Sequence, residues 1–557
     1  MKVSLSFEVI GHDVGGRIGR LHTRHGVVNT PTLLPVVHPT KNPISPKEFA
    51  SEFNCDIIIT SAYLLKQYLT RGNAELSDLH SFFHFDGPIM TDSGAFQILQ
   101  YGNISISPEE VIQFQEKIHS DIAVILDLPI GPDISYKQAE DNVNQTLQRA
   151  KESFNLRHDE DILWVGPIHG GAYFELVEHS AKTMHDLPFD MYALGSVTPL
   201  MEQYNFAQLV ESIATAKMNL PVQHPFHLFG AGHPLFFSLI VALGCDTFDS
   251  AAYALFAQKN RYMTQSGTYP LDSLEVFPCS CPICVKYVPS ELRNADSNLR
   301  YELLARHNLY VSLQEIRTIC QAILDGRLWE LLEARAHMHP RFLQAFYHLK
   351  KYRHWLEKFD PISKRRALFF SGKDGLHRPG LIRHVKQVTQ YYHPPPSTPI
   401  LVILPESKIK PFRSSSEHIR LIDRIKEVFG EYFSSLHFVT LVIPFGCVPI
   451  ELENVYPLSQ YETSGIIDQE SLISAWKALE EYLYVHRPYY RVVLLFNNTS
   501  RWESYIAEQI SFLCQQLGYL LFIVPEKIYT GALLLEQLKE IAHESLSRLK
   551  KWDMASI

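Results

Sequence analysis

Between residues 56 and 250 the chain repeats one pattern: a short apolar run, a polar or glycine-containing tip, and a segment with helical spacing of apolar residues. Strands that alternate with helices in this way predict a parallel sheet. Seven apolar runs carry the pattern, at 56–60, 88–91, 122–126, 162–165, 191–194, 226–229 and 247–248. With a strand-rich opening at 9–37, they approach the eight strands of a closed barrel. We therefore predict an α/β fold for residues 1–275, a (β/α)8 barrel of the TIM type.

The tips that follow the apolar runs share one place in such a barrel. The loops after the strands converge on its C-terminal face, where the active sites of these folds lie. The most polar tips are Asp92-Ser93-Gly94, Asp127, His169-Gly170-Gly171, Gly195-Ser196 and Asp249-Ser250. Any single Asp or Gly suits a loop, but three acids at strand ends predict one shared mouth. Paired carboxylates there suit the cleavage and re-formation of a glycosidic bond, one attacking the sugar carbon while another group handles the leaving group's proton.

One tip leaves two interpretations open. Residues 229–233 read FGAGH and contain a GxG. The two glycines are compatible with a phosphate-cradling loop, and equally with close backbone packing beside a planar ligand.

A cysteine cluster indicates a metal site. Cys279, Cys281 and Cys284 lie close together, and His307 follows about twenty residues later. Three thiolates and an imidazole complete a tetrahedral Zn²⁺ shell with no open position, so we predict one structural zinc ion in a subdomain at 276–335. The other five cysteines stand singly in apolar segments and are typical of reduced core thiols.

The C-terminal half of the sequence divides into two further parts. Residues 336–392 form a helical, basic connector, and between 341 and 386 twelve Lys or Arg alternate with aromatics, which favours contact with a polyanion. After a stiff, proline-rich linker at 393–397, strands at 400–404, 438–443, 492–496 and 520–524 alternate with helical segments at 417–429, 470–484, 503–517 and 532–549. We predict a separate α/β layered domain over 399–557.

Composition and charge narrow the class of protein. Of the 557 residues, 46% are apolar and 20% are charged, which excludes disorder, collagen and coiled coil. No stretch approaches the roughly 18 apolar residues of a membrane span, and the start carries no apolar leader. We expect a soluble, cytoplasmic chain without a membrane partner. Its net charge of −9 means that a local basic surface must hold any nucleic acid.

Four long motifs identify a family. MTDSGAFQ (90–97), LFGAGHP (228–234), FDSAAYALFAQKNRYMT (248–264) and FPCSCPICVKY (277–287) resemble the archaeal tRNA-guanine(15) transglycosylases. The resemblance spans about residues 5–385. It implies a zinc-containing (β/α)8 barrel that exchanges a guanine in the D-loop of tRNA for 7-cyano-7-deazaguanine (preQ0), in the biosynthesis of archaeosine. Relatives act as homodimers, and we expect the same of this chain.

The resemblance also assigns roles by motif. Asp249 matches the nucleophile on the ribose C1′ and Asp92 the acid/base residue; because the family's assignments differ over which of the two attacks, both are expected to be catalytic. The residues expected around the base are Asp127, Ser93, His169, Gly195 and Ser196. The residues expected to bind zinc are Cys279, Cys281, Cys284 and His307. Family members commonly have Gln where this chain has His169, and a second Gly where it has Ser196.

The last domain resembles a different enzyme. LPESKIKPFRSSSEH (404–418) and PFGCVPIELENVYPLSQYE (444–462) are similar to the core of archaeosine synthase, which adds lysine to tRNA-bound preQ0. That motif has Pro-Cys where this chain has Pro405-Glu406, and a carboxylate cannot replace a thiolate nucleophile. Two alternatives to the transglycosylase therefore stand: a lysine transferase acting on preQ0-tRNA, and a non-catalytic tRNA-binding paralogue.

Overall fold

The computed structural model describes residues 7–72, 75–76, 78–95, 106–465, 468–497, 504–525 and 534–555. Residues 96–97 of the first motif, residue 503 and residues 532–533 of two predicted helices lie outside these ranges. The chain forms two compact units, Met1–Pro361 and Ile362–Ile557.

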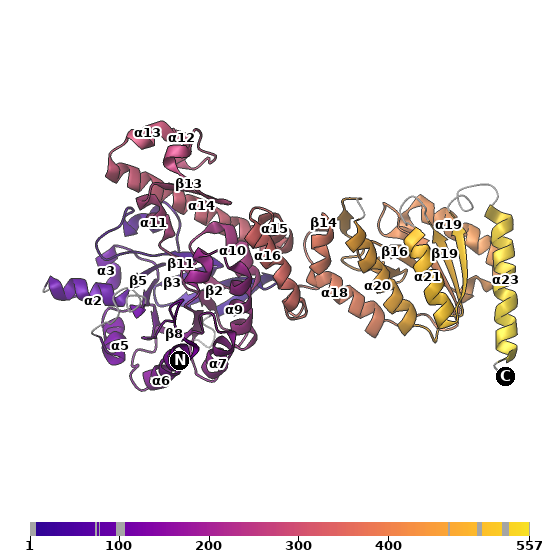
Figure 1. Cartoon of the computed structure of the whole chain (residues 1–557), viewed down its shortest axis with the longest axis horizontal. Helices are drawn as coiled ribbons and strands as arrows, with labels where there is room; N and C mark the ends of the chain where they lie inside the picture. The colour runs from indigo at the N-terminus through magenta and orange to yellow at the C-terminus, as the bar shows by residue number, and fades with distance from the viewer. Residues whose placement is uncertain are drawn as a thin grey trace. The chain divides into compact units, whose positions relative to one another are not determined.

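Eight parallel strands form the predicted barrel of the first unit (Figure 1). They are β4 (Thr32–Pro35), β5 (Ile58–Ser61), β6 (Ile89–Asp92), β7 (Ile122–Val124), β8 (Leu163–Ile168), β9 (Met191–Leu194), β10 (Phe226–Leu228) and β11 (Thr247–Ser250). Their order is β4-β11-β10-β9-β8-β7-β6-β5, and a parallel bridge between Val36 and Ile59 joins the two ends of the sheet. Each of the seven predicted apolar runs overlaps one of these strands, and β5, β6, β8 and β11 extend beyond their runs.

Helices surround the strands (Figure 1). They are α1 (Pro46–Ser51), α2 (Ala62–Arg71), α3 (Leu79–Phe83), α5 (Pro108–Lys117), α6 (Tyr136–Ser153), α7 (Phe174–His185), α8 (Thr198–Glu202), α9 (Phe206–Met218), η1 (Pro234–Phe236), α10 (Phe237–Ala242) and α11 (Ala252–Gln258). The starts of α5 and α6 are fixed by capping boxes, in which Ser107 and Ser135 each pair with the third residue of the helix. These caps set where each loop from the barrel mouth ends.

The strand-rich opening contributes only one strand to the barrel. Its first three strands, β1 (Phe7–Asp13), β2 (Gly16–Thr23) and β3 (Gly26–Thr30), form a separate antiparallel sheet. Phe7, Leu21 and Val28 from this sheet share one apolar cluster with residues that point into the barrel, among them Met90 and Val124. The small sheet therefore packs against the barrel interior.

A helical region follows the last barrel strand. It contains β12 (Arg261–Thr264), β13 (Gly267–Pro270), η2 (Leu271–Ser273), α12 (Pro282–Lys286), α13 (Pro289–Asn294), α14 (Ser297–Asp325), α15 (Leu328–Ala336), α16 (Pro340–His348), η3 (Leu349–Tyr352) and α17 (Arg353–Leu356). Figure 1 shows α12, α13 and β13 grouped at one end of α14. Asp296 caps the start of α14, and Gly326 ends it in the left-handed conformation (φ 73°).

The second unit is the predicted separate α/β domain. Its five-stranded sheet has the order β17-β16-β15-β19-β20. The strands are β15 (Ile400–Pro405), β16 (Leu436–Val442), β17 (Gly446–Pro449), β19 (Val492–Asn497) and β20 (Leu520–Pro525). All are parallel except β17, an antiparallel edge strand that the apolar pattern did not predict.

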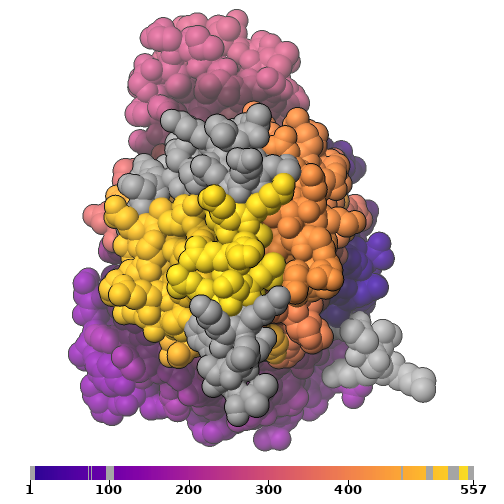
Figure 2. All heavy atoms as spheres, turned by 90° about the vertical axis from the view of Figure 1, so that its right-hand side faces the viewer, coloured from indigo at the N-terminus to yellow at the C-terminus, as the bar shows by residue number. Residues whose placement is uncertain are grey.

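Helices cover both faces of this sheet. Ile400, Val402 and Leu404 pack with α19 (Ser416–Phe429) and α23 (Leu534–Ala555). Leu401 and Ile403 face the other way, toward α20 (Gln469–Val485) and α21 (Ser504–Leu517). Burial on both sides explains why this strand reads as a continuous apolar run. Figure 2 shows α23 on the surface of the unit, in yellow.

Residues 362–398 fold with the second unit. A short strand β14 (Leu368–Phe370) pairs in parallel with β18 (Tyr461–Thr463). The remaining short elements of the unit are η4 (Lys373–His377), α18 (Pro379–Lys386), η5 (Gln387–Tyr391), η6 (Phe412–Ser414) and η7 (Gly430–Ser435). The four-part division proposed from the sequence stays a prediction. Among the described residues, no helix has both the length and the apolar character to cross a membrane.

Candidate active site and metal centre

Three carboxylates meet at the mouth of the barrel. Asp92 is the last residue of β6, Asp249 lies near the end of β11, and Asp127 follows β7. The negative charges of Asp249 and Asp127 both act on Asp92, which places the three acids in one electrostatic neighbourhood. The structure therefore brings together the acids that their positions at strand ends had grouped.

The surroundings of the Asp92 carboxyl raise its pKa, so that it can carry a proton near neutral pH. Burial raises the pKa of Asp92 to about 7, and the charges of Asp249 and Asp127 act in the same direction. A hydrogen bond from the Gly94 N–H to Oδ1 (2.6 Å) and one with Ser61 oppose the rise. An acid with a pKa near neutrality can both give and take a proton under physiological conditions.

Asp249 has different surroundings. Its Oδ1 accepts a hydrogen bond from the Gly230 N–H (2.8 Å) and lies 3.3 Å from Nε2 of His227. His227 is fully buried on β10, and Thr247 Oγ1 lies 2.9 Å from its Nδ1. If the Thr247 hydroxyl donates to Nδ1, the Nε2–H of His227 points to Asp249. Two donors then stabilise the carboxylate form of this residue.

The glycine tip at 229–233 serves this same carboxylate. Gly230 has a φ of +74°, and a Cβ at that position would lie 2.5 Å from Thr198 Oγ1. Glycine is needed for both reasons. The N–H of Gly230 donates to Asp249, so the first glycine of the GxG contacts a carboxylate of the protein itself.

Asp127 belongs to a second hydrogen-bonded group. Its Oδ1 accepts from the Ser93 hydroxyl (2.9 Å), and its Oδ2 lies 2.6 Å from His169 Nε2. On the far side of the imidazole, Nδ1 lies 2.9 Å from Ser196 Oγ. A Cβ on Gly195 would approach the His169 ring to 2.6 Å. The five residues predicted around the base therefore form one contiguous cluster across the tips of β6 to β9.

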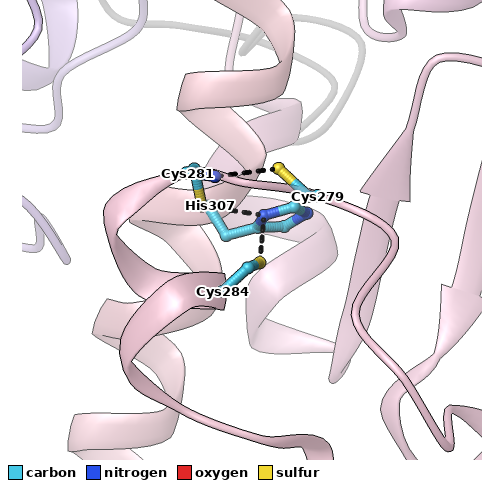
Figure 3. A group of neighbouring side chains, drawn as sticks. All are labelled: Cys279, Cys281, Cys284 and His307. Atoms are coloured by element: carbon cyan, nitrogen blue, oxygen red, sulfur yellow. Dashed lines mark hydrogen bonds between the residues drawn. The ribbon is translucent and has the colours of Figure 1, made fainter.

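The four predicted metal ligands also meet (Figure 3). Cys281 caps α12, Cys284 lies within it, Cys279 precedes it, and His307 extends from α14. The Nδ1 of His307 lies 3.3 Å from Cys284 Sγ and 3.5 Å from Cys281 Sγ. All four ligand atoms lie within 4.8 Å of one another. Hydrogen bonds from the neighbouring Cys281 and Cys284 thiols lower the pKa of Cys279, which favours a thiolate.

Groups behind the ligands orient them for a metal. His307 Nε2 lies 2.9 Å from the main-chain carbonyl of Met263, and this contact leaves Nδ1 facing the sulfurs. The ring of Tyr262 stacks on the imidazole at 3.7 Å between centroids. Such outer contacts fix the tautomer of metal-binding histidines. The three sulfurs and one nitrogen can hold one tetrahedral metal ion.

One residue that contacts the site escaped the sequence reasoning. His227 lies inside the apolar run 226–229, where a histidine is read as part of the strand. The sequence could have revealed His227, because it is the single polar residue of a buried strand that runs into the FGAG tip. The metal ligands could be predicted from their spacing, and the tip residues from their place at the end of an apolar run.

A closed barrel with three carboxylates at one mouth suits a glycosyl-transfer enzyme of the TIM-barrel class. The chain matches the family described as queuine tRNA-ribosyltransferase over residues 13–341. It belongs to that family, as the four motifs indicated. Residues 381–512 match a second family, a domain of unknown function designated DUF5591.

Curated relatives extend the match across both units. The tRNA-guanine(15) transglycosylase of Methanosarcina mazei is 43% identical over 471 residues, which cover 84% of this chain and 90% of the relative. The protein of the same name from Sulfolobus acidocaldarius is 40% identical over 483 residues, 86% of this chain and 92% of the relative. The protein of the same name from Methanococcus aeolicus is 41% identical over 477 residues, which cover 84% of this chain and 70% of the relative.

Proposed function

We propose that this protein is a tRNA-guanine(15) transglycosylase that exchanges a guanine of tRNA for preQ0 in archaeosine biosynthesis. The observation that carries the proposal is the contrast between Asp92, whose pKa is about 7, and Asp249, which two donors support at the same mouth. A double displacement at a sugar carbon requires a carboxyl that gives and takes a proton beside a second carboxylate that attacks the carbon. The names of the relatives supply the guanine of tRNA as the site of exchange, and preQ0 comes from the resemblance of the four motifs.

In the first step Asp249 attacks C1′ of the ribose. The bond between C1′ and N9 of guanine breaks, its electron pair goes to the base, and Asp92 donates a proton to that base. In the second step N9 of preQ0 attacks C1′ and gives its proton to Asp92, and the ester to Asp249 breaks. The target nucleotide must leave the folded RNA to reach the mouth. Two inversions restore the ribose configuration.

The base site is assigned to the cluster around Asp127. Its carboxylate can accept from the N–H groups on the edge of a guanine-like base. Ser93, His169, Gly195 and Ser196 complete the site. The tips of four neighbouring strands thus surround a base whose ribose reaches Asp249.

We assign zinc to the Cys3His cluster, at one ion per chain. The four ligands leave no open coordination position, so the ion stabilises the subdomain and all chemical steps belong to the barrel residues. Eight cysteines, all free in the structure, fit a reducing compartment such as the cytoplasm.

We also propose that two copies of the chain associate through the metal subdomain. Three valines beside the cluster are strongly exposed: Val276 at 73%, Val285 at 75% and Val288 at 52%. Apolar side chains grouped on one exposed segment are typical of a protein interface.

The lysine-transferase alternative is disfavoured by the surroundings of Glu406. This residue follows β15, and its Oε1 accepts a hydrogen bond from the Tyr461 hydroxyl (2.9 Å). The Lys410 ammonium lies 4.1 Å from the centre of the Tyr461 ring. A carboxylate in that position supplies no thiolate. We therefore assign the second unit to tRNA binding.

The test is exchange of labelled guanine into unmodified tRNA by the full chain. We expect incorporation by the wild type and none by Asp249→Asn, with zinc content and melting temperature unchanged, because Asn fills the same space without a nucleophilic oxygen anion. Exchange at the wild-type rate by Asp249→Asn would refute the role of this residue. A wild-type chain that binds tRNA without exchange would favour the non-catalytic paralogue.

A further inference from the structure

Ser196 has a backbone conformation that serine seldom adopts. Its φ is +62°, in the left-handed region that favours glycine. Backbone outliers of this kind persist where the surrounding structure holds them, and they cluster at functional sites. Here the hydroxyl oxygen accepts a hydrogen bond from the Ile130 N–H (2.7 Å) and lies 2.9 Å from His169 Nδ1. The contact with His169 is a use that requires the side chain.

His169 has both of its ring nitrogens engaged. It is 2% exposed, with Nε2 at 2.6 Å from Asp127 Oδ2 and Nδ1 at 2.9 Å from Ser196 Oγ. One arrangement of protons satisfies every partner. The Asp127 carboxylate only accepts, so the Nε2–H donates to it, and the Ser196 hydroxyl donates to Nδ1 while its oxygen accepts from Ile130. No ring nitrogen is left to bind a base.

The imidazole is also confined by its neighbours. Gly195 leaves just enough room, since a Cβ there would lie 2.6 Å from Cε1 of His169. The main-chain N–H of His169 donates to Ser180 Oγ (3.3 Å). Ser180 therefore contacts only the backbone, while Asp127 and Ser196 contact the ring, and the imidazole transmits its position to one atom of the site, Oδ2 of Asp127.

We infer that Ser196 and His169 are a coupled pair of positioning residues that fixes the Asp127 carboxylate for recognition of the base. The inference rests on the proposed function, in which Asp127 accepts from the base, and it narrows the roles of His169 and Ser196 within that site. Ser93 fixes the other carboxylate oxygen, so both oxygens are oriented. The pair determines how tightly a guanine-like base binds, whereas the chemical steps belong to Asp92 and Asp249.

The test is a double-mutant cycle with Ser196→Ala, His169→Gln and both together. Ala keeps the Cβ and the left-handed backbone and removes only the hydroxyl. We measure KM and kcat for guanine in tRNA exchange, the Kd of preQ0 by calorimetry, and the melting temperature. Ser180→Ala is the matched control, because it removes a contact to the His169 main chain and leaves the ring contacts in place.

We expect each single substitution to raise KM for guanine and Kd for preQ0 by about tenfold, with a smaller effect on kcat. In the double variant, KM and Kd should rise no further than in the more affected single variant, because either change breaks the same chain of hydrogen bonds. Ser180→Ala should leave both constants near the wild-type values.

Three results overturn the inference: single effects that multiply in the double variant, an unchanged KM and Kd in Ser196→Ala, or a wild type that does not bind preQ0. The second criterion does not depend on His169→Gln folding. The calorimetric Kd separates this inference from the proposed function. A wild type that binds preQ0 without exchange refutes the transglycosylase while the cycle still decides the coupling, and a wild type that does not bind preQ0 refutes the coupling itself.

Discussion

The three aspartates at the barrel mouth are chemically alike and differ only in what surrounds each carboxyl. Asp92 is half-buried near two other acids, Asp249 receives donors from Gly230 and His227, and Asp127 is fixed by hydrogen-bonding side chains. These surroundings raise the pKa of Asp92 and provide hydrogen-bond donors to Asp249. The positions of the acids could be predicted from the sequence because each stands at the end of an apolar run. Their division of roles could not, since it depends on neighbours far along the chain.

The pKa of Asp92 predicts how the first step depends on pH. Below about pH 7 Asp92 carries the proton that the leaving guanine takes; above it the protonated fraction falls tenfold for each pH unit. The single-turnover rate of forming the covalent RNA adduct should therefore decline as pH rises through about 7. Rates can be followed on denaturing gels, and a profile that stays flat to about pH 9 would contradict this assignment.

His227 supplies a second prediction. His227→Phe removes the donor to Asp249 and should slow adduct formation by about tenfold or more, because a hydrogen bond to a charged group is lost. His227→Gln, which can still donate, should recover part of the rate. Equal rates for Phe and Gln would show that His227 fills space without positioning the nucleophile.

Among the elements, the barrel strands were the most predictable and the edge strands the least. Seven of the eight barrel strands coincide with an apolar run that a polar tip follows in the sequence. The antiparallel strand β17 (Gly446–Pro449) has only four residues and follows its partner closely, so it leaves no periodic signal. The strand β14 depends on β18, about ninety residues later, and a local pattern cannot reveal such a pairing.

The metal subdomain gives a prediction at this scale. Cys281→Ser should reduce bound zinc from about one ion per chain to near zero and lower the melting temperature, because α12 and α14 are joined through the ligands. Cys320→Ser is the control, since Cys320 also lies on α14 but outside the cluster. Full retention of metal by Cys281→Ser, measured by elemental analysis, would refute the assignment.

For the whole molecule, the composition of a segment does not tell which of its side chains reach the surface. The aromatics between 341 and 386 looked like partners for a polyanion, yet Phe342, Phe346 and Phe370 are buried in the cores of their units. Arg378 is buried as well and donates to the main-chain carbonyl of Phe369 (3.0 Å). The contact of this segment with a polyanion stays a prediction, and we expect it to involve only side chains that are exposed.

Association of two chains is a prediction at the same scale. Val285→Asp should shift the molecular mass from that of a dimer toward 63.9 kDa, because it places a charge on the proposed apolar interface. Val222→Asp is the matched control, being 53% exposed and outside the metal subdomain. Light scattering gives the masses, and a dimer unaffected by Val285→Asp would exclude this face.

The central claim is that the barrel inserts preQ0 into tRNA without help from the last domain's chemistry. The most direct measurement is to incubate the purified chain with unmodified tRNA, preQ0 and lysine, digest the RNA and determine the masses of the nucleosides. The account predicts a preQ0 nucleoside whether or not lysine is present. A lysine adduct that forms only on tRNA already carrying preQ0, with no insertion of the free base, would contradict it.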